Sequence, residues 1–397
     1  MPSLNYNFAL RVGYPQSKQL LTVLQIILLL QAFTGTTDGL NQKRSDYDPT
    51  TDSLRFEGEV HLRNIRQLTF GGNNAEAYWS FDDQQLIFQS DWAEINSQGC
   101  DQQFVMDPDV PGEYTLVSTG QGRTTCGYFL PDGRVLYAST HATSLECPAP
   151  PEAGDRYVWA IYDSFDIYVA ESDYSNPELL IGGPGYDAEA TVSPDGRFIV
   201  FTSTRSGDLD LWRYEIATGE TIQLTNTLGY DGGAFFSRDS KRIVWRAGRP
   251  VGEDAHNYRK LLDQGLIEPG ELNVFVADID GGNVRQVTDA PGANWSPFFH
   301  PDGEHVIYAS NYESVGRGRP VFAIYMVEIA TGVTTKVTHS NTFDAFPMFS
   351  FDGKRLLFSS NRNVTRTPSR DTNVFVADWV AEPEAVDYEF KSVVEGK

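Results

Sequence analysis

One phrase of about fourteen residues recurs six times in this chain of 397 residues. Each copy has an apolar run, a turn that contains an aspartate and a second apolar run, as in ATVSPDGRFIVFTS from Ala190. This shared aspartate, called the marker Asp here, recurs at intervals of 44 to 63 residues, at Asp82, Asp132, Asp195, Asp239, Asp302 and Asp352. Repetition at this period predicts an array of six similar structural units.

Each phrase is typical of a β-hairpin, because a marker Asp followed by Gly, as in Asp195-Gly196, favours a tight turn that needs positive φ. A second strand, glycine turn and strand follow most phrases, for example from Asp210, Asn273 and Ala323. Four strands in about 45 to 60 residues match one blade of a β-propeller. The sequence therefore predicts an all-β fold, a six-bladed β-propeller.

The last unit lacks a fourth strand after residues 373–380, whereas residues 65–69 (IRQLT) match the fourth-strand endings IQLT, RQVT and TKVT. We therefore expect an N-terminal strand to complete the last blade, because a ring left open would expose unpaired backbone groups. An open solenoid of six hairpins is the alternative, and it would not need this strand.

An apolar stretch at residues 20–33 follows a segment whose only charges are Arg11 and Lys18, a pattern typical of a secretory signal. A buried helix is the other interpretation. The expected organisation is a signal peptide or N-terminal anchor at 1–35, a linker at 36–60, the propeller at 61–380 and a tail at 381–397. The protein is then periplasmic or secreted, and no span crosses the membrane unless the N-terminal segment is retained.

The formal net charge of −23 argues against nucleic-acid binding and against docking on anionic lipid. We expect a monomer with a protein, peptide or glycan ligand. The three cysteines show no C-x-x-C spacing, and in an exported protein they favour one disulfide, for which we prefer Cys100 with Cys147. A catalytic Cys126 is an alternative, although the sequence identifies no partner base for it.

Loops before the first strand and after the second strand of each phrase must share one face of a propeller, called the upper face here. Long insertions follow the second strand at residues 141–164, 248–270, 312–320 and 362–372, and the second of these has a helical pattern at 254–265. Because loops on a rigid scaffold often carry binding residues, we expect ligands at the upper face.

Three sets of equivalent positions lie near this face. The first ring, eight residues before the marker Asp, is Asn74, Thr124, Asp187, Asp231, Asn294 and Asp344. The second ring, two residues later, is Glu76, Cys126, Glu189, Gly233, Ser296 and Phe346. The rim set, about ten residues after the marker Asp, is Trp92, His141, Arg205, Arg249, Tyr312 and Arg362. The rim set contains the candidate ligand-binding residues.

The carboxylates of the rings allow two interpretations. In one, the carboxylates bind a hard cation such as calcium or the cationic part of a ligand, and the candidate metal ligands are Asp187, Glu189, Asp231 and Asp344. In the other, the carboxylates accept loop N–H groups and pair with the three arginines of the rim set to join the blades. His141 could be catalytic or a hydrogen-bonded loop residue. We expect no metal-ligand spacing among the remaining histidines, which are His61, His256, His300, His305 and His339.

The phrases SPDGRFIVFTSTRSGDLDLW from Ser193 and FDGKRLLFSSNRN from Phe351 resemble the repeats of TolB-like, WD-repeat-like six-bladed propellers. The propeller of the prolyl oligopeptidase family has similar repeats. The resemblance covers residues 61–380 and implies an exported, non-catalytic binding scaffold. No G-x-S-x-G motif is present, so it implies no peptidase activity. The alternatives are a metal-dependent propeller lyase or hydrolase with a channel-mouth carboxylate site, and a regulatory subunit of a separately encoded peptidase.

Overall fold

The computed structural model describes residues 52–152, 154, 156–363 and 370–383. The chain divides into two compact units at Asp48, and the first unit lies outside the described residues. The expected signal segment at 1–35, most of the expected linker and most of the expected tail also lie outside them, so those boundaries stay predictions. No helix within the described residues is long and apolar enough to span a bilayer.

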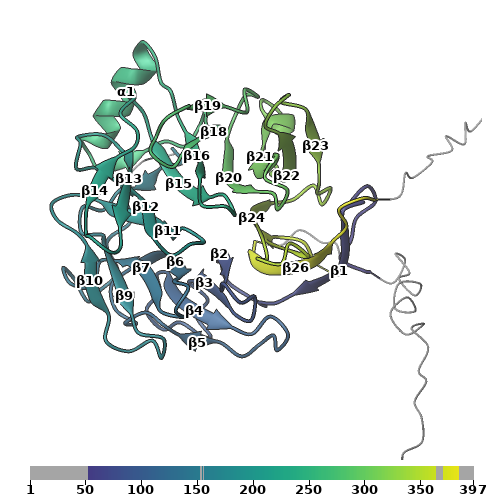
Figure 1. The fold of residues 1–397 in the computed structure, drawn as a ribbon, viewed down its shortest axis with the longest axis horizontal. Coiled ribbons are helices and arrows are strands. Elements are labelled where there is room, and N and C mark those ends of the chain that lie inside the picture. Colours follow the sequence, from purple (N-terminus) through teal and green to yellow (C-terminus); the bar gives the residue numbers. More distant parts are fainter. Residues whose placement is uncertain (1–51, 153, 155, 364–369, 384–397) are drawn as a thin grey trace, which may run out of the picture. The chain divides into compact units, whose positions relative to one another are not determined.

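Six four-stranded antiparallel sheets follow one another around a ring (Figure 1). Blade one contains β2 (Asn74–Trp79), β3 (Leu86–Ser90), β4 (Gln102–Met106) and β5 (Thr115–Leu116). Blade two contains β6 (Thr124–Phe129), β7 (Val135–Ser139), β9 (Asp166–Ala170) and β10 (Glu178–Ile181). Blade three contains β11 (Asp187–Val192), β12 (Phe198–Ser203), β13 (Asp210–Glu215) and β14 (Thr221–Gln223). The prediction of an all-β, six-bladed propeller is confirmed.

The remaining blades follow the same order. Blade four contains β15 (Asp231–Phe236), β16 (Arg242–Ala247), β18 (Asn273–Asp278) and β19 (Arg285–Gln286). Blade five contains β20 (Asn294–Phe299), β21 (His305–Ser310), β22 (Ala323–Glu328) and β23 (Thr334–Lys336). Blade six contains β24 (Asp344–Phe349), β25 (Arg355–Ser360), β26 (Asn373–Trp379) and, as its outer strand, β1 (Leu62–Gln67).

The ring is closed by the pairing of its first and last strands, as expected. Strand β1 runs antiparallel to β26, with Leu62 opposite Trp379 and Gln67 opposite Phe375 (purple beside yellow in Figure 1). The side chain of Leu62 is fully buried against apolar residues of blades five and six. The N-terminal segment also contributes Glu59, which is buried beside Arg362 of blade six.

Each innermost strand contains a break in register, and the same repeat position takes a positive φ in all six blades. These residues are the second ring: Glu76, Cys126, Glu189, Gly233, Ser296 and Phe346, with φ between 45° and 59°. Such a bulge turns a side chain away from the regular alternation of the sheet. The second ring therefore lines the central channel.

The repeated phrase is one residue shorter in blade two than in blade three. Its second strand, β7, has five residues where β12 of blade three has six. Consequently Ser139 lies opposite Thr124, as Ser203 lies opposite Asp187. The one-residue deletion brings His141 to the position that Arg205 occupies in blade three.

The upper-face insertions contain the remaining elements. Helix α1 (Glu253–Leu262) begins one residue before the expected helical stretch at 254–265 and ends three residues before its end, and a short 3₁₀ turn covers Tyr312–Ser314. Strand β8 (Trp159–Ala160) of the blade-two insertion pairs with β17 (Leu266–Ile267) of the blade-four insertion. The predicted disulfide between Cys100 and Cys147 is present, with a Cα–Cα distance of 6.0 Å, and Cys126 is free.

Candidate functional site

The first ring is buried between the blades. Each of its three aspartates forms an ion pair with the arginine of the rim set in its own blade: Asp187 with Arg205 at 2.7 Å, Asp231 with Arg249 at 2.6 Å, and Asp344 with Arg362 at 3.2 Å. The expected pairing of these carboxylates with the rim arginines is therefore observed, although each pair lies within one blade. The four proposed calcium ligands do not form a group among the described residues. Calcium binding stays a prediction that these ion pairs do not support.

The second ring surrounds a polar cluster at the channel. Glu189 accepts hydrogen bonds from the Tyr230 hydroxyl at 2.7 Å, the Gly233 amide at 2.8 Å and Arg246 at 2.9 Å. Gly233 has no side chain, and the guanidinium of Arg246 occupies the place where its Cβ would be. Arg246 thus contributes the blade-four side chain at this level of the channel, although it belongs to the second strand of that blade.

Glu76 and Cys126 lie next to each other and line the same part of the channel as Glu189 and Arg246. The Cys126 thiol donates a hydrogen bond to Glu76 Oε2 at 2.9 Å. Burial raises the pKa of Glu76 from 4.5 to about 7, and the Cys126 bond and the nearby Arg246 only partly oppose this. Burial and the nearby carboxylates Glu76 and Glu189 raise the pKa of the Cys126 thiol well above its usual value. Cys126 therefore stays protonated at neutral pH and is a poor nucleophile.

The blade-two insertion forms a roof over this cluster. The indole of Trp159 on β8 lies 5.3 Å from the Arg246 guanidinium, and its ring centroid lies 5.8 Å from that of Trp295 and 6.0 Å from that of Tyr230. Pairing of β8 with β17 fixes the roof from a second insertion. A cavity of about 400 Å³ remains beneath and beside the roof.

The walls of this roofed cavity combine aromatic rings with a few polar groups. Its lining includes Tyr157, Trp159, Tyr186, Trp295 and Phe346, together with Glu76, Cys126, Glu189 and Arg246. Apolar walls with a small number of oriented polar groups are typical of binding pockets. The sequence predicted the second ring but not the roof or the role of Arg246.

The rim set lies outside the lining of this cavity. His141 Nδ1 lies 2.8 Å from Ser139 Oγ, and its ring packs on Tyr168 at 4.3 Å. Burial lowers the pKa of His141, which agrees with a neutral, hydrogen-bonded residue. Tyr312 packs on Tyr325, and Trp92 on Tyr114. Ligand binding by the rim set stays a prediction.

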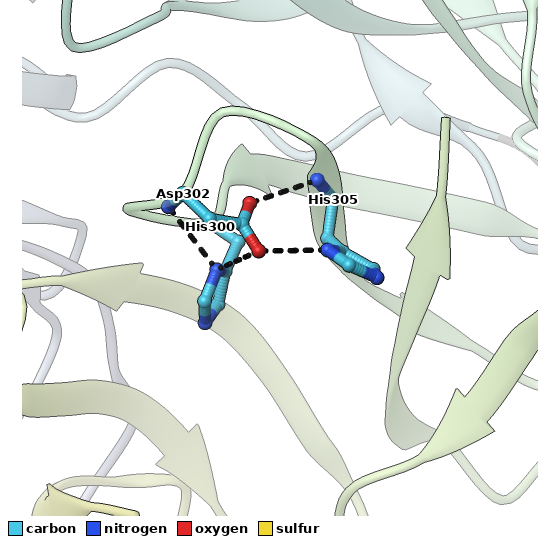
Figure 2. A group of neighbouring side chains, drawn as sticks. All are labelled: His300, Asp302 and His305. Carbon is cyan, nitrogen blue, oxygen red and sulfur yellow. Dashed lines mark hydrogen bonds and ion pairs between the residues drawn. The ribbon is translucent and has the colours of Figure 1, made fainter. Parts of the chain in front are cut away.

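A second cluster lies on the opposite face, in the marker turn of blade five (Figure 2). His300 Nδ1 and His305 Nδ1 lie 2.9 Å and 2.8 Å from the same oxygen, Asp302 Oδ2. The expectation that no histidine has metal-ligand spacing is wrong for this pair. The sequence signal for this group is H-x-D-x-x-H, because a tight hairpin turn brings these three side chains together.

Comparisons with known proteins support the fold. Residues 266–367 match the family model of the TolB beta propeller domain. An uncharacterised protein of Agrobacterium fabrum is 29% identical over 36% of this chain and 46% of its own length. The Tol-Pal system protein TolB of Wolinella succinogenes is 24% identical over 49% of this chain and 40% of its own length. The matched part thus spans less than half of these relatives.

A solved structure assigned as a TolB of Agrobacterium tumefaciens aligns with a TM-score of 0.50 at 16% identity, over 80% of this chain and 97% of that one. At this identity the likeness concerns the fold alone. The repeated blades and their closure define a six-bladed β-propeller of the repeat-protein class. Within that class, the chain is similar to the TolB-like propellers.

Proposed function

We propose that this protein is an exported, non-catalytic scaffold that binds a protein or peptide at its upper face, in and around the roofed cavity. A TolB-like propeller fold suggests protein binding. The observation that carries the proposal is the roof itself, because two insertions from non-adjacent blades pair with each other beside the channel. A glycan is the other ligand class that aromatic walls of this kind could hold.

Two features support export. The apolar segment at residues 20–33, outside the described residues, has the pattern of a secretory signal. The Cys100–Cys147 disulfide suits an oxidising compartment. A scaffold role, rather than catalysis, is supported by the chemistry of the channel. The Cys126 thiol is protonated, and Glu189 is held by four neighbouring donors, from Thr202, Tyr230, Gly233 and Arg246.

Site-specific photocrosslinking tests this proposal. Tyr157, at the edge of the roofed cavity, is 72% exposed, so a benzoylphenylalanine can replace it without disturbing the core. We expect this variant, expressed in its native cell, to crosslink to a discrete partner that protease digestion removes. Loss of the partner on glycosidase treatment instead would identify a glycan.

The matched control is Val333, which is 64% exposed in the turn between β22 and β23 on the opposite face. Equal crosslinking from Tyr157 and Val333 would contradict an upper-face site. Crosslinking from Val333 alone would place the binding surface on the marker-turn face and overturn the proposal.

A further inference from the structure

The marker turn of blade five differs from the other turns in a way that the fold does not require. In four other blades a serine two residues before the marker Asp donates its hydroxyl to the Asp Oδ1; these serines are Ser80, Ser193, Ser237 and Ser350. Blade five has His300 at that position. Three residues after the marker, blades four and six carry arginine, whereas blade five carries His305. Both replacements place imidazoles at the same carboxylate.

The two carboxylate oxygens of Asp302 have different partners. Oδ1 accepts the backbone N–H groups of Glu304 at 2.7 Å and His305 at 3.0 Å, which completes the turn. Oδ2 faces the two Nδ1 atoms instead.

Neighbouring blades hold this turn from both sides. Arg242 of blade four donates a hydrogen bond to the carbonyl of Gly303 at 2.6 Å. Phe349 and Trp379 of blade six pack edge-on against the His300 ring, with centroid distances of 4.9 Å and 5.6 Å. The backbone and one imidazole are therefore fixed before any ligand arrives, which is the condition for a preorganised site.

We propose that His300, Asp302 and His305 bind a divalent transition-metal ion such as Zn²⁺. Two imidazoles and one carboxylate are ligands that Zn²⁺ accepts. Their candidate ligand atoms lie within 4.8 Å of one another. Around a tetrahedral zinc ion, neighbouring ligand atoms lie about 3.3 Å apart, which is about half an ångström more than the present distance from each imidazole Nδ1 to Asp302 Oδ2.

Solvent can reach the site and supply the remaining ligand. The side chains of Asp302 and His305 are 36% and 29% exposed, whereas His300 is 13% exposed. The expected arrangement is one anchored histidine, one aspartate and one histidine nearer the surface, with water completing the coordination. This site lies at the marker turns, on the face opposite the roofed cavity, and it does not depend on the proposed binding function.

The experiment is a titration of the tag-free full chain with Zn²⁺ by calorimetry and with Co²⁺ by visible absorption. We expect one ion per chain and, for Co²⁺, the d–d bands of a site with nitrogen and oxygen ligands. His300→Ser and His305→Arg each adopt the residue that other blades use at that position, so both should fold. Each should weaken binding by about tenfold or more, because one of three protein ligands is lost.

The matched control is His256→Ala, which removes an exposed histidine of helix α1. It should bind Zn²⁺ like the original protein. Melting curves of all variants report whether they are folded. Absence of stoichiometric binding, or equal binding by the folded His300→Ser and His305→Arg variants, would overturn the proposal.

Discussion

The environment of single residues at the channel depends on side chains from neighbouring blades. Gly233 takes a φ of 59° and leaves room for Arg246, whose charge is balanced by Glu189 of blade three. A side chain at position 233 would meet the guanidinium of Arg246 and require it to shift from its present place beside Glu189. A charge buried without its partner costs several kcal/mol, so this glycine fixes the ion pair as well as the backbone.

Glu76 should make stability fall as pH rises. Its folded-state pKa of about 7 lies above the ordinary value of 4.5. Between these two values the folded protein holds a proton that the unfolded chain has lost. Folding is therefore penalised increasingly from about pH 4.5 to 7, by up to about 3 kcal/mol above that range.

Glu76→Gln removes this penalty, because glutamine does not ionise. Urea unfolding at pH 5 and pH 8 should show that the stability of the variant relative to the original protein rises with pH. Glu94→Gln, at an exposed position, is the control and should show no such trend. A constant difference between Glu76→Gln and the original protein at both pH values would contradict the assigned ionisation.

At the scale of elements, the upper-face insertions are connected both covalently and by strand pairing. The Cys100–Cys147 disulfide ties the blade-two insertion to blade one, and β8 ties it to β17 of the blade-four insertion. These links hold the blade-two insertion to blade one and to the blade-four insertion. The disulfide and the strand pairing together hold the roof over the channel.

Reduction of this disulfide should lower stability by about 2 to 4 kcal/mol, because it closes a loop with a sequence separation of 47 residues and so restricts the unfolded chain. Thermal melts with and without dithiothreitol measure the effect. The Cys100→Ser, Cys147→Ser double variant should melt like the reduced protein and should not respond to the reductant. A response of the double variant equal to that of the original protein would show that another process is responsible.

Elements differ in how far the sequence could predict them. The hairpins and the closing strand were predictable, because six copies of one phrase show which positions alternate and which strand is missing. Strands β8 and β17 have two residues each and lie in unrelated insertions, so no periodicity indicates their pairing. Arg246 was missed because its side chain fills the position of a glycine on another strand. The sequence contains H-x-D-x-x-H in blade five, but only the folded hairpin turn shows that these three side chains meet.

At the scale of the whole molecule, the pairing of β1 with β26 is decisive, because the N-terminal strand completes the last blade and covers its otherwise unpaired outer edge. Deletion of Leu62–Gln67 should abolish cooperative thermal unfolding. The deletion exposes the edge of β26 and removes the buried side chains of Leu62 and Ile65. Calorimetry of the deletion variant checks this.

Arg66→Ala is the control within the same strand, because Arg66 is exposed and its ion pair with Asp109 lies at the surface. A surface pair of this kind contributes at most about 1 kcal/mol, so this variant should keep a single sharp transition. A deletion variant that melts in the same way as Arg66→Ala would refute a ring sealed by β1.

The same pairing has a consequence for biosynthesis. Strand β1 leaves the ribosome, and any export channel, more than 300 residues before its partner β26. Blades one to five can form in order as the polypeptide emerges, but blade six cannot be completed until nearly the entire chain is available. A truncated translation product would consequently lack a sealed ring and expose β-sheet edges, which makes it a natural substrate for chaperones and quality-control proteases.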